Sequence, residues 1–232
     1  MSIITLNGID KIYNPDKVPV TALSGIQLKV EKGDFLAIVG PSGSGKTTLL
    51  NIISGLDQPT SGNVFIDGID ISKMKPDELI EFRLNHIGFV FQAYNLIPVL
   101  TALENVEFIM LLQNAPKTER IQRAMEILKN VGLEERVHAK PSELSGGQQQ
   151  RVAVARALAS RPSFVLADEP TANLDSSSAE SLLDIMERLN REQAMTFLFS
   201  THDPRVMKRA HRIITLQDGR ITSDETKNSR SS

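Results

Sequence analysis

The chain contains no cysteine and no tryptophan, and only 5% of its 232 residues are aromatic. The absence of cysteine excludes disulfides and thiolate metal sites, and it suits a reducing compartment. A formal net charge of −2 argues against a protein that coats nucleic acid, so we expect no nucleic-acid partner. No apolar run approaches the roughly 18 residues that cross a bilayer, and no signal-peptide pattern opens the sequence. If the protein works at a membrane, we expect a partner to carry the spans.

A glycine-rich loop is the strongest feature that is present. It follows the apolar residues 35–39 and has the spacing Gly, four residues, Gly-Lys-Thr. Backbone N–H groups of such a loop curl around an oxyanion, with Lys46 reaching the terminal phosphates and the Thr47 hydroxyl holding Mg²⁺. A plain glycine-rich turn is disfavoured, because both the strand and the helix that the motif requires flank it. The predicted triphosphate site comprises Gly40, Pro41, Ser42, Gly43, Ser44, Gly45, Lys46, Thr47 and Thr48.

Polar side chains follow two further apolar strands. Asp168 and Glu169 come after residues 164–167, where a phosphate-loop enzyme holds its metal. We therefore predict that Asp168 lies beside Mg²⁺ and that Glu169 is the general base for the attacking water, the alternative being a solvated strand end. His202 follows residues 196–200, at the edge where open α/β sheets bind ligands. It is placed to donate a hydrogen bond to the γ-phosphate, although a single histidine in a sequence more often has a structural role.

Three other features have both a functional and a structural interpretation. Tyr13 lies on a predicted strand near the phosphate loop, where its ring either stacks on adenine or packs against neighbouring strands. Gln92 ends the apolar residues 87–91, and its amide oxygen either ligates Mg²⁺ or is solvated. Residues 93–100 form an apolar loop, which is either a docking surface for another chain or buried under helices.

A second anion-binding helix start occurs at residues 144–148. Ser145 is a suitable N-cap, and Gly146 and Gly147 leave the first amides of the helix bare. A compact monomer does not need two such sites for one nucleotide. We therefore expect this site to serve a nucleotide held by another copy of the chain.

The order of the segments predicts an α/β fold: a phosphate-loop core with a mostly parallel sheet, an antiparallel β subdomain and a helical subdomain. Within the β subdomain, Asn7-Gly8 is typical of a tight hairpin turn. We assign residues 1–75 and 161–221 to the core and β subdomain, and residues 76–160 to the helical subdomain. Residues 222–232 are polar and aperiodic, so we expect them to be disordered.

With these motifs in order, residues 1–221 resemble the ATP-binding subunit of an ATP-binding cassette (ABC) transporter. The phosphate loop together with Leu-Ser-Gly-Gly-Gln at residues 144–148 carries the resemblance, and no motif is degenerate. It implies an ATPase that forms a head-to-tail homodimer, with each ATP between the phosphate loop of one copy and the signature of the other. The family's order implies catalytic roles for Lys46, Gln92, Glu169 and His202, ATP contacts from Tyr13, Ser145, Gly146, Gly147, Gln148 and Asp175, and Mg²⁺ ligation by Thr47, Gln92 and Asp168.

The segments 88–92, 95–98 and 104–106 look like cassettes of the lipoprotein-releasing and macrolide-exporting group. That likeness implies an integral membrane permease docking near Gln92 to Leu100, and a peripheral location on the cytoplasmic face of the inner membrane. It implies export, or transmission of motion to the periplasm. A regulatory cassette that signals without transport, as in cell division, is the alternative. A DNA-repair clamp is disfavoured, because no sustained heptads occur between residues 47 and 144.

Overall fold

The computed structural model describes residues 2–14 and 17–227 and contains two separate β-sheets. The strands are β1 (Ser2–Tyr13), β2 (Val20–Glu31), β3 (Phe35–Val39), β4 (Ser61–Ile66), β5 (Ile69–Asp70), β6 (Ile87–Val90), β7 (Phe164–Asp168), β8 (Thr196–Ser200), β9 (Arg212–Gln217) and β10 (Arg220–Thr226). The α-helices are α1 (Lys46–Ile53), α2 (Pro76–His86), α3 (Ala102–Leu112), α4 (Lys117–Asn130), α5 (Gly146–Ala159), α6 (Ser176–Gln193) and α7 (Pro204–Arg209). Short 3₁₀ turns are η1 (Ile71–Lys73), η2 (Glu134–Arg136) and η3 (Pro141–Glu143).

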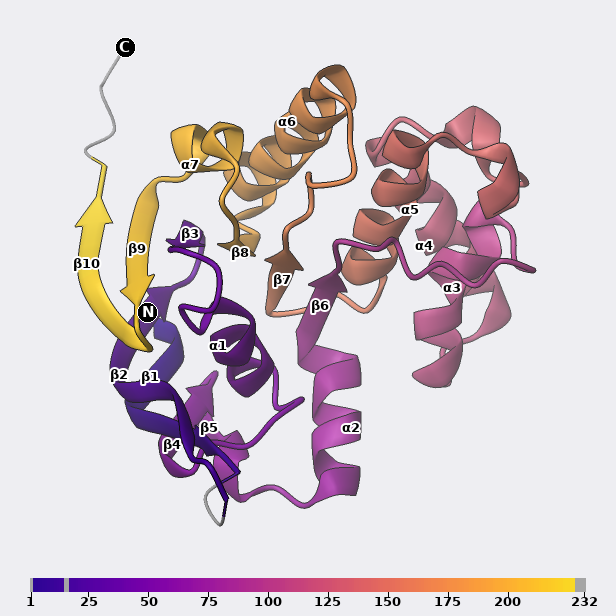
Figure 1. Cartoon of the computed structure of the whole chain (residues 1–232). Coiled ribbons are helices and arrows are strands. Elements are labelled where there is room, and N and C mark those ends of the chain that lie inside the picture. The colour runs from indigo at the N-terminus through magenta and orange to yellow at the C-terminus, as the bar shows by residue number, and fades with distance from the viewer. Residues whose placement is uncertain (1, 15–16, 228–232) are drawn as a thin grey trace.

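The larger sheet has six strands in the order β10-β9-β3-β8-β7-β6, and only β10 and β9 pair antiparallel. The smaller sheet has four antiparallel strands in the order β2-β1-β4-β5. Figure 1 shows this smaller sheet beside α1, while α3, α4 and α5 gather beyond β6 at the other side. The predicted α/β class, with a mostly parallel core sheet, an antiparallel β part and a helical part, is therefore confirmed.

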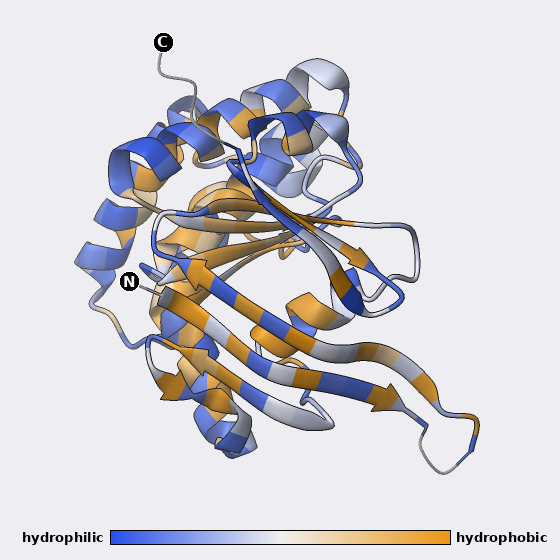
Figure 2. Ribbon diagram, turned by 90° about the vertical axis from the view of Figure 1, so that its left-hand side faces the viewer, coloured by the Kyte–Doolittle hydropathy of each residue, from blue (hydrophilic) through white to orange (hydrophobic). Residues whose placement is uncertain are grey.

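Strand β3 occupies the middle of the larger sheet and is buried along its whole length. Its Phe35 ring lies 4.7 Å from the ring of Phe199 and 5.7 Å from that of Phe197, both on β8. Figure 2 shows that the inner strands of the larger sheet are mostly hydrophobic, whereas hydrophobic and hydrophilic residues alternate along the long strands of the smaller sheet. Burial of the apolar strand fixes the direction in which the glycine loop leaves the sheet.

Two large apolar clusters account for most of the interior, and a small third one joins Ala37 and Val39 of β3 to Ala210. Of the two large clusters, one joins α3, α4, α5 and α6 to one face of the larger sheet, and the other joins α1, α2 and the smaller sheet to the opposite face. Leu79 and Phe82 of α2 belong to the second cluster, and β6 pairs with β7 in the larger sheet. The assignment of residues 76–160 to one helical subdomain stays a prediction, although its first two elements pack with the sheets.

The expected hairpin turn at Asn7-Gly8 is wrong. Strand β1 continues through it, and its pairing with β2 shifts register between Leu6 and Ile9. Gly8 has φ +60°. Because β2 and β4 hold β1 from both sides, the extra residue is absorbed as a bulge and does not reverse the chain.

The expected disorder of residues 222–232 is also wrong in part, because β10 runs to Thr226. The Arg212 guanidinium of β9 binds both carboxylate oxygens of Asp224, with Nε to Oδ1 at 2.7 Å and Nη2 to Oδ2 at 2.6 Å. This ion pair and the antiparallel pairing with β9 give residues 222–226 an ordered structure. Their composition alone had predicted disorder. Residues 228–232 lie outside the described residues. Within the ranges that are described, none of the helices is both long and apolar enough to span a bilayer.

We expect Asp224→Ala to lower the free energy of unfolding by about 0.5–1.5 kcal/mol, since it removes a two-point charged hydrogen bond at a half-exposed site. Urea unfolding at low salt would measure the change. Glu225→Ala on the same strand is the matched control and should change the free energy by less than about 0.5 kcal/mol. Equal effects of the two substitutions would contradict an anchoring role for the Arg212–Asp224 pair.

Candidate functional site

A cavity of about 800 Å³ lies at the edge of the larger sheet where β3, β7 and β8 end. Its lining combines the phosphate loop with residues that were singled out elsewhere in the sequence, and with a few that were not. The lining residues are Tyr13, Val20, Thr21, Ala22, Gly40, Pro41, Ser42, Gly43, Gly45, Lys46, Thr47, Thr48, Gln92, Asp168, Glu169, Ser200 and His202. Segments from both sheets thus converge on one polar, cationic loop.

The phosphate loop packs tightly against β9 and β2. A Cβ on Gly40 would lie 2.1 Å from the carbonyl oxygen of Leu216, and one on Gly45 would lie 2.6 Å from that of Ala22. Gly45 also has φ +104° and precedes α1 without a capping side chain. Lys46 Nζ folds back to donate to the carbonyl oxygens of Gly40 at 2.8 Å and Pro41 at 3.0 Å. The first amides of α1 and the lysine ammonium therefore present positive charge to the cavity.

Ser44, which we placed in the triphosphate site, is buried and does not line the cavity among the residues described. Its Oγ has no hydrogen-bond partner in that part of the chain. Its backbone does shape the loop, because the Ser44 carbonyl accepts from Gly219 N at 3.0 Å. The other eight predicted loop residues all face the cavity.

Asp168 lies on the same rung of the sheet as the end of the phosphate-loop strand, because Ser200 pairs with both Ile38 and Asp168. Burial raises the pKa of the Asp168 carboxyl, and the neighbouring Glu169 charge adds to that rise against a hydrogen bond from Ser200 and the charge of Lys46. A half-buried carboxylate with a raised pKa is a good site for a cation that restores the lost solvation.

Glu169 is held in a strained backbone conformation at the next position, with φ +46°. Its N–H donates to the Ser200 carbonyl at 2.9 Å. Both carboxylate oxygens also have partners, since His202 Nδ1 lies 2.7 Å from Oε1 and the Thr201 hydroxyl donates to Oε2 at 3.2 Å. The carboxylate is therefore aimed by its backbone and by two residues that follow β8.

The donor set at the cavity fits a hard divalent cation. Thr47, Gln92 and Asp168 all line it, and they offer a hydroxyl, an amide oxygen and a carboxylate, which are the ligand types that Mg²⁺ takes alongside phosphates and water. No cluster of three or more His, Asp or Glu side chains suited to a metal occurs among residues 2–14 and 17–227. The residues thus suit an ion shared with a phosphate ligand better than an all-protein metal site.

The second anion-binding helix start does not reach this cavity. The residues Ser145, Gly146, Gly147, Gln148 and Asp175 are absent from its lining in the described part of the chain. Ser145 Oγ accepts from Gln148 N at 3.2 Å, and Gln148 Oε1 accepts from Ser145 N at 2.9 Å, so the two residues form the N-terminal capping box of α5. The first-turn amides of Gly146 and Gly147 have no acceptor within the helix.

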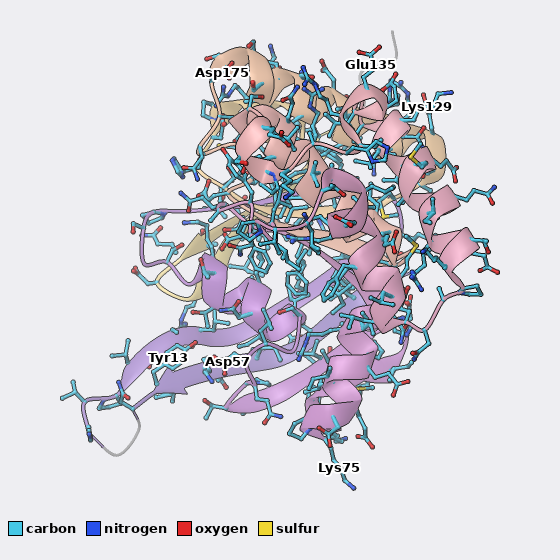
Figure 3. The ribbon with its side chains drawn as sticks, turned by 90° about the vertical axis from the view of Figure 1, so that its right-hand side faces the viewer. Tyr13, Asp57, Lys75, Lys129, Glu135 and Asp175 are labelled. Atoms are coloured by element: carbon cyan, nitrogen blue, oxygen red, sulfur yellow. The ribbon has the colours of Figure 1, made fainter. Side chains whose placement is uncertain are left out.

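Asp175 caps α6 by accepting from the Ser178 N–H at 3.0 Å and from the Ser177 hydroxyl at 2.6 Å. These hydrogen bonds, first that of Ser177, hold the pKa of Asp175 well below its ordinary value. Figure 3 shows Asp175 in a different part of the molecule from Tyr13. Its position agrees with the structural role of a helix cap, and its contact with ATP stays a prediction.

Tyr13 stands at the rim of the cavity with 36% of its surface exposed. Its hydroxyl donates to Asp57 Oδ2 at 2.7 Å, and this hydrogen bond restrains the orientation of the ring. The structure therefore brings Tyr13 to the phosphate loop, as the stacking interpretation requires, and gives the ring a partner that we did not anticipate from the sequence.

Side chains of α5 and of the loop after β7 hold the segment that follows β6. Gln150 Nε2 donates to Phe91 O at 3.2 Å and to Pro170 O at 2.9 Å, and Asn173 Nδ2 donates to Gln92 O at 3.0 Å. Arg156 Nη2 donates to Tyr94 O at 3.1 Å, and its Nη1 reaches the next carbonyl. A lone Gln or Arg on a helix gives no sequence signal for this role, because the carbonyl acceptors are distant in the chain.

The same segment borders an apolar groove of about 660 Å³, formed with α2, α3 and α5. Ile97 lines the groove, whereas Leu96 packs against the interior and Val99 is 72% exposed. Asn105 of α3 fixes this loop, accepting from Ile97 N at 2.8 Å and donating to the carbonyls of Ile97, Leu100 and Thr101. Residues 93–100 are thus partly buried and partly open to a partner.

Sequence reasoning missed the lining residues Val20, Thr21, Ala22 and Ser200 and the supporting residue Thr201. A signal existed for Ser200 and Thr201, since they are polar residues at the carboxyl end of an apolar strand, where open sheets bind ligands. No comparable signal marked residues 20–22, because only the packing of β2 against the glycine loop places them there.

Comparisons with known proteins agree with this arrangement. The family model described as "ABC transporter" matches residues 23–172. An uncharacterised ABC transporter ATP-binding protein of Bacillus subtilis, YvrO, is 53% identical over 222 residues, which are 96% of each chain. The macrolide export ATP-binding/permease protein MacB of Syntrophobacter fumaroxidans is 47% identical over 95% of this chain but only 31% of its own length. The dimeric post-hydrolysis structure of the cassette MJ0796 with ADP and Pi has a TM-score of 0.88, 45% identity and coverage of 97% and 99% of the two chains.

The raised pKa of Asp168 leads to a stability prediction. The folded chain binds this proton more tightly than the unfolded chain, so the contribution of Asp168 favours folding at low pH and is lost as the pH rises through the raised pKa. In EDTA and without nucleotide, we expect Asp168→Asn to raise the midpoint of thermal unfolding at pH 7 by about 1–3 °C. The gain should vanish toward about pH 4.

Glu135→Gln, which alters an exposed carboxylate, is the control for this series and should leave the midpoint unchanged at every pH. An Asp168→Asn chain that unfolds at a lower temperature than the native chain at pH 7 would show that ionised Asp168 stabilises the fold.

Proposed function

The chain belongs to the ABC transporter family, and we propose that it is the ATPase subunit that closes as a homodimer around two ATP to drive an integral membrane permease. The observation that carries the proposal is the separation of the two anion-binding helix starts. The cavity holds one, at α1, and the other, at Ser145–Gly147 on α5, lies outside its lining in the described part of the chain. A head-to-tail pair would bring the α5 site of one copy over the cavity of the other. The dimeric MJ0796 structure, at 45% identity, supports this arrangement.

The residues of the cavity have distinct roles in the proposed hydrolysis. Lys46 and the loop amides bind the terminal phosphates, which draw the ammonium away from the carbonyls of Gly40 and Pro41. Glu169 accepts a proton from the attacking water at a carboxylate oxygen. His202 positions Glu169 through the 2.7 Å contact and is available to the γ-phosphate. The signature amides of the second copy complete the stabilisation of the phosphoryl charge.

Mg²⁺ is the metal that the donor set favours, and Thr47, Gln92 and Asp168 are the residues that we propose for it. When bound, the ion would neutralise charge on the β- and γ-phosphates. Partial burial raises the pKa of Asp168, so a cation at this site would offset the cost of its ionised form. Gln92 lies in the segment after β6. Gln150 of α5 binds the backbone of Phe91, and Asn173 of the loop after β7 binds that of Gln92, so the position of Gln92 depends on both side chains.

The apolar groove is the proposed docking site for the permease. It is lined mainly by side chains such as Phe89, Ile97 and Leu112, and it borders the segment that carries Gln92. An apolar helix of the permease seated there would press on the backbone that positions Gln92. We place the chain, through that partner, at the cytoplasmic face of the inner membrane.

Transport by export or by mechanical transmission to the periplasm is the proposed role within the family. The relative MacB supports it, because that protein is named as a macrolide export ATP-binding/permease protein. No feature of the cavity favours the alternative of a regulatory cassette that signals without transport. Substrate choice resides in the permease, and the protein that co-purifies with this chain from membranes would identify it.

Glu169→Gln tests the shared site. We expect the variant to bind ATP but to lose hydrolysis by about 100-fold or more, which would trap the closed dimer. Sedimentation velocity with and without MgATP measures the trap, and the native chain should show ATPase activity that rises more than linearly with concentration. Unchanged turnover would remove Glu169 from the role of base. Specific activity independent of dilution, with a monomer in sedimentation, would rule out the shared site.

Ile97→Glu tests the docking groove. A charge in this apolar groove should weaken binding to the permease by about tenfold, because the carboxylate would have to be desolvated. Met125→Glu is the matched control, since Met125 of α4 is an exposed apolar residue that is not part of the groove lining described above. In the native cell, the fraction of chain that sediments with membranes should fall for Ile97→Glu only, while nucleotide binding by the purified chains stays equal. Normal membrane association of Ile97→Glu would count against the groove.

A further inference from the structure

Asp57, in the loop after α1, gathers three hydrogen bonds beside the cavity. Its Oδ1 accepts from Lys11 Nζ at 2.6 Å and from the N–H of Gln58 at 2.8 Å, and its Oδ2 accepts from the Tyr13 hydroxyl at 2.7 Å. The backbone N–H of Asp57 also donates to Asn51 O at 3.1 Å, which ties the carboxylate to the last turn of α1. The carboxylate therefore links β1 to the helix that begins in the phosphate loop.

Lys11 adds a second restraint on the same ring. Its ammonium lies over the Tyr13 ring, 4.8 Å from the centroid, in a cation–π contact. Lys11 also donates to the carbonyl oxygen of Gln58 at 2.8 Å, so its own position is fixed. Tyr13 lines the cavity, whereas Lys11 is outside its lining in the residues described. The Lys11 ammonium thus contacts the Tyr13 ring from outside the cavity, while Tyr13 itself forms part of the cavity lining.

The ionisation states suit this arrangement at neutral pH. Burial and the hydrogen bond to Asp57 raise the pKa of the Tyr13 phenol, so it remains a donor. Burial alone would raise the pKa of Asp57, but the hydrogen bonds from Lys11 and Tyr13 outweigh it and the pKa is lowered. Figure 3 shows Tyr13 and Asp57 together, far from Glu135.

We propose that Lys11 and Asp57 are positioning residues for nucleobase binding, because they hold the Tyr13 ring in the orientation that a purine stacks on. The inference rests on the proposed function and deepens it, since it assigns a role to two residues outside the nucleotide cavity. A ring that is fixed before the ligand arrives loses less conformational freedom on binding than a mobile one. The alternative is a purely structural role, in which these contacts only join β1 to α1.

Binding of ADP and of inorganic pyrophosphate separates the two roles, because only ADP carries a base. With isothermal titration calorimetry we expect Asp57→Ala to raise the Kd for ADP about three- to tenfold, the size expected from a lost ordering hydrogen bond. The Kd for pyrophosphate should stay within about twofold. In a Tyr13→Ala chain, adding Asp57→Ala should change the Kd for ADP by less than about twofold, because Asp57 acts only through the ring.

Two further variants keep the test decisive if Asp57→Ala unfolds. Tyr13→Phe retains the ring without its hydroxyl, and Lys11→Met removes the ammonium but leaves the Tyr13–Asp57 bond in place. Each should raise the Kd for ADP by about two- to fivefold without changing that for pyrophosphate. Glu135→Ala, which removes a distant carboxylate, is the matched control and should change neither value.

Three results would overturn the inference: an unchanged Kd for ADP in these variants, an equal loss of pyrophosphate and ADP binding, or additive effects in the Tyr13→Ala chain. Failure of the native chain to bind ADP would instead overturn the proposed function, so the two failures are distinguishable.

Discussion

The parallel register of β3, β8 and β7 is the constraint on which the rest of the structure depends. Ile38, Ser200 and Asp168 lie on one rung of the larger sheet, so the three strands end together. The phosphate loop, Glu169 and the Thr201–His202 pair follow those ends directly. Both faces of β3 are buried, with Phe35 in one apolar cluster and Leu36 and Ile38 in another, so a one-residue slip in this register would place these side chains in the wrong cluster.

Function at this edge opposes local stability in two places. Glu169 occupies a left-handed backbone conformation, and Asp168 is a half-buried carboxyl whose pKa is raised. Both are features that a fold selected for stability alone would avoid. The surrounding contacts over-determine them, since the Ser200 carbonyl and the Thr201 and His202 side chains all restrain Glu169.

The segment after β6 borders both the polar cavity and the apolar groove. Its backbone carbonyls are held by Gln150 and Arg156 of α5 and by Asn173 of the loop after β7. Helix α5 begins at the second anion-binding site, and Arg156 also borders the apolar groove. In the proposed complex, a partner seated in the groove would contact a segment that hydrogen bonds join both to Gln92 and to helix α5. Rigid contact of this kind lets a small displacement alter both sites together.

The sequence by itself determined the phosphate loop, the carboxylate pair after β7 and the Ser145 cap of α5, because each depends on neighbouring residues and on a strand or helix of clear periodicity. It also determined the α/β class. Only the tertiary structure decided that Asn7-Gly8 is a bulge, that residues 222–226 form a strand, and that Ser44 is buried. It alone paired Tyr13 with Asp57 and placed residues 20–22 in the cavity. These features depend on partners far along the chain, and local propensity carries no information about which distant backbone or side chain a residue will meet.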